Sequence, residues 1–142
     1  MDTFDISALE TSDTGFVHLK NPQNEEPIFL GSGDDAKPVG ITVHAPGTKA
    51  YVAAEDRRTN QQLLRNRRTK KVTAENLRED NQRFFADVTV SFDNLSFKAA
   101  GDATGKDMFL ALYSDPKFGW VTDQVNAFLN DWGSFTTTSP TS

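Results

Sequence analysis

The two histidines, His18 and His44, are the side chains best suited to proton transfer near neutral pH. Each lies in a short apolar run, and neither has an acidic residue close to it in the sequence. A catalytic base needs a partner that orients it. The chain has no cysteine, which excludes thiolate nucleophiles, thiolate metal sites and disulfides. We therefore expect both histidines to be half-buried strand residues.

Two segments come close to ligand-binding motifs and fall short of them. Asp34 and Asp35 lack the alternating oxygen ligands of a calcium loop. Segment 101–107 resembles a phosphate-binding loop, but its glycines are one residue too close together. In addition, Asp107 stands where a Ser or Thr would bind magnesium, and its carboxylate would repel phosphate. We expect no catalytic, cofactor-binding or metal-binding residues, and no enzymatic activity.

A run of cations between residues 57 and 71 contains no acidic residue. Such a run could neutralise phosphates, but no aromatic residue interleaves it to stack on bases, and the whole chain has a net charge of −5. A protein partner, or the acidic strand region of a neighbouring copy, is therefore favoured over nucleic acid, and a solvated helix face is the alternative. The candidate partner-binding residues of this run are Arg57, Arg58, Arg65, Arg67, Arg68, Lys70 and Lys71. Reversing the charges of Arg65 and Arg68 is expected to weaken association and leave the fold intact.

Residues 4–47 have the pattern of short β-strands joined by tight turns. Apolar runs at 15–19 and 28–30 are separated by turn-forming residues. Further on, Val39, Ile41 and Val43 alternate with small or polar residues, which predicts a strand with one buried face. Together these runs predict a small antiparallel sheet.

From Thr48 the pattern becomes helical. Residues 48–69 contain no Pro or Gly and few apolar side chains, which predicts a helix capped by Thr48 that either lies on the surface or packs against another chain. We expect Thr73 to cap a second helix that continues to about residue 93, because apolar residues from Leu77 onward recur at helical spacing. The alternative is a strand over 88–92, where apolar residues alternate.

Two shorter helices are expected after a loop at 94–104. The first is capped by Thr104 and runs to Ser114. The second begins at Asp115-Pro116, has the clearest apolar stripe of the chain and ends at a Gly133 cap. Residues 134–142 are rich in Ser, Thr and Pro, which predicts a disordered tail whose removal changes thermal stability little.

Aromatic side chains on the later helices are expected to fill most of the core, and the chain has eleven Phe. These residues are Phe84, Phe85, Phe109, Phe118, Trp120, Phe128 and Trp132. Among them, Trp120 lies off the apolar stripe and is the best candidate for an exposed hydrophobic contact. The patterns together predict one α+β domain over 1–133, with a small N-terminal antiparallel sheet (4–47) followed by about four helices (48–133).

Several short motifs occur in a characteristic order along the chain. They are Phe4-Asp5-Ile6, Leu19-Lys20-Asn21-Pro22, the strand 38–47 leading into Lys49-Ala50-Tyr51, Thr73-Ala74-Glu75, Phe84-Phe85-Ala86, Leu112-Tyr113-Ser114-Asp115-Pro116 and Asn126-Ala127-Phe128-Leu129. In this order, over residues 4–135, the chain resembles the tail assembly chaperones of long-tailed (siphovirus-type) bacteriophages.

The resemblance implies an α+β protein, made in the infected bacterium, that binds the long helical tape measure protein and keeps it soluble. It also implies that the protein helps tail tube protein subunits assemble, acts as a homo-oligomer without cofactors in the host cytoplasm, and is absent from the finished virion. The acidic start and the lack of a long apolar run agree with an expected cytosolic location and no membrane span. The alternatives are a virion structural protein of the tail or head–tail connector, and a nucleic-acid-binding module using residues 57–71.

Overall fold

An antiparallel sheet organises the fold by joining segments that lie far apart in the sequence. Its strands are β1 (Thr14–His18), β4 (Gly40–His44) and β5 (Thr89–Asp93), in the order β1-β4-β5. On the central strand, Ile41 lies opposite Val17 on one side and Phe92 on the other. The structure is a computed structural model that describes residues 2–69 and 72–135.

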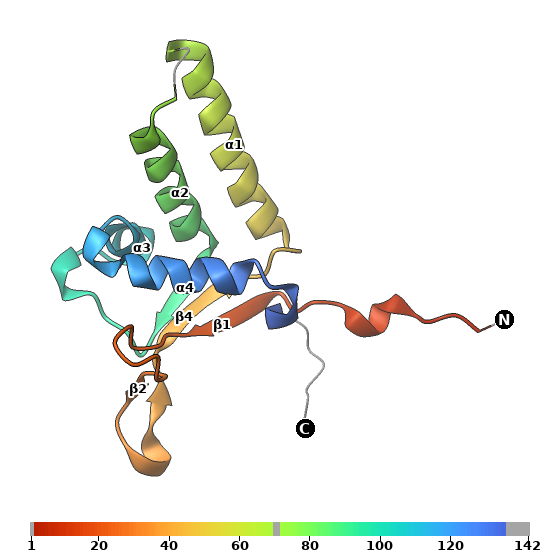
Figure 1. The fold of residues 1–142 in the computed structure, drawn as a ribbon, viewed down its shortest axis with the longest axis vertical. Helices are drawn as coiled ribbons and strands as arrows, with labels where there is room; N and C mark the ends of the chain where they lie inside the picture. The colour runs from red at the N-terminus through yellow and green to blue at the C-terminus, as the bar shows by residue number, and fades with distance from the viewer. Residues whose placement is uncertain (1, 70–71, 136–142) are drawn as a thin grey trace.

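Helices and smaller elements surround this sheet (Figure 1). The helices are α1 (Lys49–Thr69), α2 (Ala74–Val88), α3 (Gly105–Tyr113) and α4 (Gly119–Leu129), and β2 (Phe29–Leu30) pairs with β3 (Lys37–Pro38) in a separate antiparallel hairpin. Figure 1 shows α1 and α2 rising together from the sheet, the β2–β3 hairpin projecting at the opposite end and the N-terminal residues extending to one side. The predicted α+β class, with a small antiparallel sheet and helices, is confirmed.

The core lies where the sheet meets the later helices. Ile41 and Val43 of β4 are fully buried, as are Val88 at the end of α2 and Val125 on α4. The strands also approach closely at Gly40, where a Cβ atom would lie 2.2 Å from the carbonyl oxygen of Val17. A glycine is therefore required at this position of β4 by the close approach of β1.

The expectation that the second helix continues to residue 93 is wrong. Helix α2 ends at Val88, and the chain continues as β5, which pairs with β4. The backbone of β5 forms hydrogen bonds with the second edge of β4, whose buried N–H and C=O groups would otherwise be unpaired. Because β5 lies between the helices, the division into a β-rich part at 4–47 and a helical part at 48–133 is also wrong.

A buried hydrogen bond fixes the junction between α2 and β5. The Thr89 hydroxyl lies 2.8 Å from the carbonyl oxygen of Phe85 and 2.7 Å from the Tyr113 hydroxyl, which ties this junction to the end of α3. Burial raises the pKa of Tyr113 to about 12, so its hydroxyl stays protonated at neutral pH.

The predicted helix starts are confirmed for the first two helices and differ in detail for the others. The hydroxyls of Thr48 and Thr73 accept the backbone N–H groups of Tyr51 and Asn76, as N-caps do. Thr104 precedes α3, but its side chain makes no capping hydrogen bond.

Asp115 caps a 3₁₀ turn at Pro116–Phe118, and α4 begins only after that turn. Helix α4 then ends at Leu129 with Asn130 in the C-cap position, so the expected cap at Gly133 is wrong. Gly133 instead belongs to a second 3₁₀ turn, Trp132–Phe135, which brings the chain back to the sheet.

Phe135 belongs to the core, which corrects the domain end at residue 133. Its side chain is 1% exposed and meets the ring of Phe128 edge to face at 5.0 Å between centroids. Its carbonyl oxygen accepts the backbone N–H of Ser12 at 2.6 Å. The ring occupies the space left by Gly15, where a Cβ atom would lie 2.6 Å from it. The expected disordered tail, 134–142, is therefore wrong for its first two residues, and residues 136–142 lie outside the described residues.

We predict that Phe135→Ala destabilises the protein by about 3–5 kcal/mol, because it removes a buried aromatic ring and leaves a cavity. Trp132→Ala is the matched control, since that side chain is 57% exposed and lies on the same turn. Its expected change is within about 1 kcal/mol. Urea denaturation followed by circular dichroism measures both values, and equal losses in the two variants would contradict the assignment of Phe135 to the core.

Candidate partner-binding surfaces

Helices α1 and α2 pack as an antiparallel hairpin whose outer half is joined by polar side chains. The Nε and Nη2 atoms of Arg65 lie 3.2 and 3.1 Å from Oδ1 of Asp80, and its Nη1 lies 2.9 Å from Oδ1 of Asn76. Asp80 is only 4% exposed. Arg65 therefore provides the positive charge that a buried carboxylate needs, which is an internal structural role.

Two further arginines of α1 also contact α2. Arg57 Nε lies 3.1 Å from Oδ2 of Asp87, whose other oxygen binds Lys106 Nζ at 3.2 Å. The Arg58 guanidinium carbon stands 3.9 Å from the centroid of the Phe84 ring, a cation–π arrangement. These contacts lie nearer the sheet than the Arg65 pair and continue the attachment of α1 to α2.

The structure therefore divides the predicted cationic surface into separate groups. Arg57, Arg58 and Arg65 contact α2, whereas Arg67 and Arg68 are exposed on the last turn of α1. Among the candidate partner-binding residues, Arg65 pairs with the buried Asp80 of the same chain, so its charge is already used within the fold. Sequence spacing could not show this, because the carboxylates that pair with these arginines belong to the following helix. Lys70 and Lys71 lie outside the described residues.

The prediction for Trp120 is wrong as well. Its side chain is half-buried and packs against the hydrophobic core, because α4 contacts both α3 and β1 and more than one of its faces is covered. The exposed tryptophan is Trp132, which the amphipathic stripe had assigned to the core. Since α4 ends at Leu129, Trp132 does not share the helical face on which that prediction depended.

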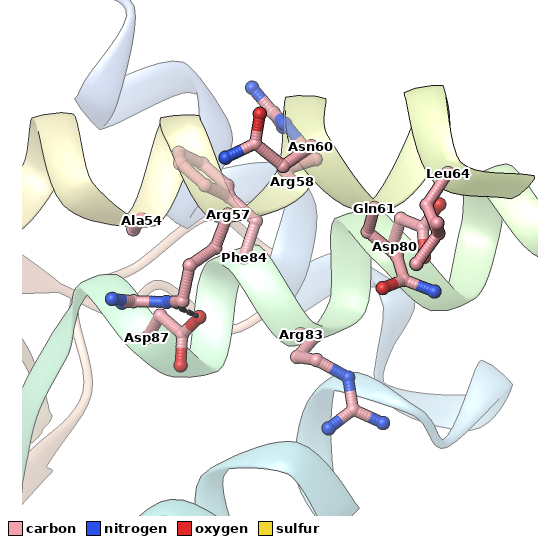
Figure 2. Close-up of a pocket in the computed structure, with 10 residues that line it drawn as sticks. All are labelled: Ala54, Arg57, Arg58, Asn60, Gln61, Leu64, Asp80, Arg83, Phe84 and Asp87. Atoms are coloured by element: carbon pink, nitrogen blue, oxygen red, sulfur yellow. Dashed lines mark hydrogen bonds and ion pairs between the residues drawn. The ribbon is translucent and has the colours of Figure 1, made fainter.

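A groove between α1 and α2, which we call the arginine groove, has a volume of about 300 Å³ (Figure 2). Its apolar lining consists of the exposed Leu64 and the buried Ala54 and Phe84, and Arg57 and Arg58 stand beside them. Arg83 also lines the groove, and Figure 2 shows its side chain extending away from α1. The surface thus combines apolar contact area with positive charge. The remaining lining residues are Asn60, Gln61, Asp80 and Asp87.

A wider groove of about 890 Å³ lies between α2 and α4, and we call it the acidic groove. The buried rings of Phe85 and Tyr113 contribute to its lining. Acidic side chains outnumber basic ones around it, although Arg58 and Arg78 also line it. The acidic residues are Glu75, Glu79, Asp115 and Asp123.

Each projecting element exposes large apolar side chains that the sequence analysis did not identify as contact surfaces. In the N-terminal segment, Phe4 and Ile6 are 71% and 76% exposed. The others are Leu9 in the same segment, Phe29 and Leu30 on the β2–β3 hairpin, and Val52, Leu63, Leu64 and Leu77 on the helical hairpin. The sequence feature that could have identified these surfaces is the presence of large apolar residues in segments too polar to form a hydrophobic core.

The histidines are half-buried strand residues, as predicted. His18 Nε2 lies 2.9 Å from the carbonyl oxygen of Ile28, and its ring packs against Phe16 and Phe29. His44 ends β4. Among the residues that the structure describes, no three His, Asp or Glu side chains gather as metal ligands do.

No helix in the described part of the chain is both long and apolar enough to span a membrane. Comparison with protein-family models, curated proteins and solved structures yields no match to this chain.

We predict that Arg65→Glu destabilises the protein by about 3–5 kcal/mol, because it places a second carboxylate beside buried Asp80 and removes its counter-charge. This corrects the expectation that charge reversal at Arg65 leaves folding intact. Arg68→Glu, on the same helix with the same charge change, is expected to cost less than about 1 kcal/mol because Arg68 is exposed. Thermal unfolding measures the difference, and equal stability of the two variants would contradict the structural role of Arg65.

Proposed function

We propose that this chain is a tail assembly chaperone of a long-tailed bacteriophage, which binds the tape measure protein and keeps it soluble. The observation that carries the proposal is the exposure of large apolar side chains on each projecting element, together with two grooves in the helical part. Such surfaces suit association with another polypeptide. The resemblance in motif order supplies the identity of that polypeptide.

The acidic groove is the proposed site for the tape measure protein. A long helical chain with apolar stripes aggregates unless those stripes are covered, and a helix lying in a groove is a common way to cover them. The buried rings of Phe85 and Tyr113 back this groove, and the surrounding carboxylates suit Lys or Arg flanking the stripe. The net charge of −5 favours the solubility of the resulting complex.

In this proposal the protein acts by association in the host cytoplasm, without a cofactor or a chemical step. It forms a homo-oligomer, promotes assembly of the tail tube protein around the tape measure protein and then leaves the particle. Because the grooves and the projecting elements lie on different parts of the surface, one molecule has room for more than one partner.

A structural protein of the tail or of the head–tail connector is the second candidate. The extended N-terminal segment and the β2–β3 hairpin favour it, because projecting elements with exposed apolar residues suit subunits that interlock with their neighbours. Mass spectrometry of purified particles distinguishes the two candidates: the chaperone is expected to be missing, and the structural protein to be present in many copies.

The third candidate is a nucleic-acid-binding module, and ion pairs within the helical hairpin argue against it. Arg57 and Arg65 pair with carboxylates of α2, which partly neutralises the charge that would attract phosphates.

We predict that co-expression with the tape measure protein raises its soluble fraction, and that Glu75→Lys combined with Asp123→Lys reduces this effect. The two substitutions reverse charge at the acidic groove, and both side chains are exposed, so the fold should be retained. Asp34→Lys combined with Asp35→Lys makes the same change of net charge on an exposed turn distant in sequence. The soluble fraction is measured by centrifugation and immunoblotting.

The control variant is expected to behave as the unmodified chain does. Failure of the unmodified chain to raise the soluble fraction would contradict the proposed function. An equal loss in both variants would show that net charge, rather than the acidic groove, governs the effect.

A further inference from the structure

The N-terminal arm, residues 2–10, is exposed along its whole length. Within the described part of the chain, its hydrogen bonds join positions of the arm to one another: the Ser7 N–H donates to Asp5 Oδ1, the Ala8 N–H to the Asp5 carbonyl and the Glu10 N–H to the Ser7 carbonyl. These bonds form a 3₁₀ turn, Ile6–Leu9. The arm is thus locally ordered, yet its large apolar side chains lack cover from the body of the molecule.

The root of the arm, in contrast, is fixed to the body. Ser12 donates its backbone N–H and its hydroxyl to the carbonyl oxygen of Phe135, at 2.6 and 2.9 Å, and the Asp13 carbonyl accepts the N–H of Ala45. Figure 1 shows the arm leaving the sheet and extending away from the body. From Ser12, the eight residues to Phe4 reach at most about 28 Å. The arm is therefore presented to a neighbouring molecule from an anchored base.

The arm is both apolar and acidic. It carries Asp2, Asp5 and Glu10 and no basic side chain. The hydrogen bond from the Ser7 backbone lowers the pKa of Asp5, so this carboxylate is ionised at neutral pH. Two acids flank Phe4, which is 71% exposed. A surface that covers the arm must therefore offer apolar lining to an aromatic ring and positive charge on both sides of it.

The arginine groove offers this combination, and the acidic groove does not. The exposed side chain of Leu64 gives the arginine groove apolar surface beside the buried Ala54 and Phe84, and its volume of about 300 Å³ accommodates a phenylalanine side chain. Arg57, Arg58 and Arg83 also line it, and of these Arg58 and Arg83 pair with no carboxylate among the described residues.

The carboxylates near the arginine groove already have counter-ions, since Asp80 pairs with Arg65 and Asp87 with both Arg57 and Lys106. The acidic groove, with more carboxylates than cations, would repel the arm.

We propose that the N-terminal arm of one copy of this chain binds the arginine groove of a second copy, with Phe4 seated against Leu64 and the acids of the arm facing Arg58 and Arg83. The arm and the groove are different surfaces, so the contact is head-to-tail: each molecule offers a groove and an arm at once. Such contacts build rings where the rotation closes and filaments where it does not. The inference deepens the proposed self-association and does not depend on binding to the tape measure protein.

The chain has no cysteine, which allows a direct test by cross-linking at introduced cysteines. A Thr3→Cys variant is mixed with an Asn60→Cys variant and treated with a short bis-maleimide cross-linker. Thr3 adjoins Phe4, Asn60 lines the arginine groove, and both side chains are exposed, so neither substitution should disturb the fold. The expected product is a dimer linked between the two variants, with a yield that falls as salt is added.

Two matched controls decide the result. A Gln23→Cys variant, also exposed, replaces the Asn60→Cys variant and should give little product. Adding Phe4→Ser to the Thr3→Cys chain should lower the yield about tenfold, since Phe4 is the proposed anchor, whereas adding Phe29→Ser, at another exposed Phe, should not.

Two outcomes would overturn the inference: a yield no greater than that of the Gln23→Cys control, or no effect of Phe4→Ser. The tape measure protein is absent from this experiment. Its failure is therefore distinct from a failure of the proposed function, which the soluble fraction of that protein tests.

Discussion

The pairing of β4 with a strand on each side is the constraint on which the rest of the structure depends. Both edges of β4 carry backbone hydrogen bonds, and its Ile41 and Val43 side chains are fully buried. The partner strands lie before and after the helical hairpin in the sequence, so the pairing holds both ends of α1–α2 against one sheet. The close approach at Gly40 leaves no space for a side chain there. Phe135 then completes the packing beside Gly15.

The helical hairpin is held together in a different way from the sheet. Near the sheet, Ala54 and Phe84 supply buried apolar contact, and Arg58 packs over the Phe84 ring. Farther out, the pair of Arg65 and Asp80 replaces apolar packing, and Oδ2 of Asp80 has no hydrogen-bond partner among the described residues. A buried ion pair adds little net stability, but it is costly to break. The hairpin thus keeps its geometry while leaving Leu63 and Leu64 exposed.

Helix α2 contributes to both grooves and gives them different electrostatic character. Asp80, Arg83, Phe84 and Asp87 line the arginine groove, while other positions of the helix, Phe85 among them, line the acidic groove. Ligands of opposite charge are therefore favoured on the two surfaces. This separation is what makes self-association through one groove compatible with binding of a second polypeptide in the other, as the proposed chaperone requires.

The sequence by itself determined the α+β class, the starts of α1 and α2 at Thr48 and Thr73, and the strand placement of both histidines. Periodicity and capping are local, so they can be recognised within one segment. Only the tertiary structure decided the strand at Thr89–Asp93, the burial of Phe135, the pairing of Arg65 and the exposure of Trp132 rather than Trp120. Each of these features depends on a contact between segments that are distant in the chain. The residue pattern within one segment does not show which other segment it will contact.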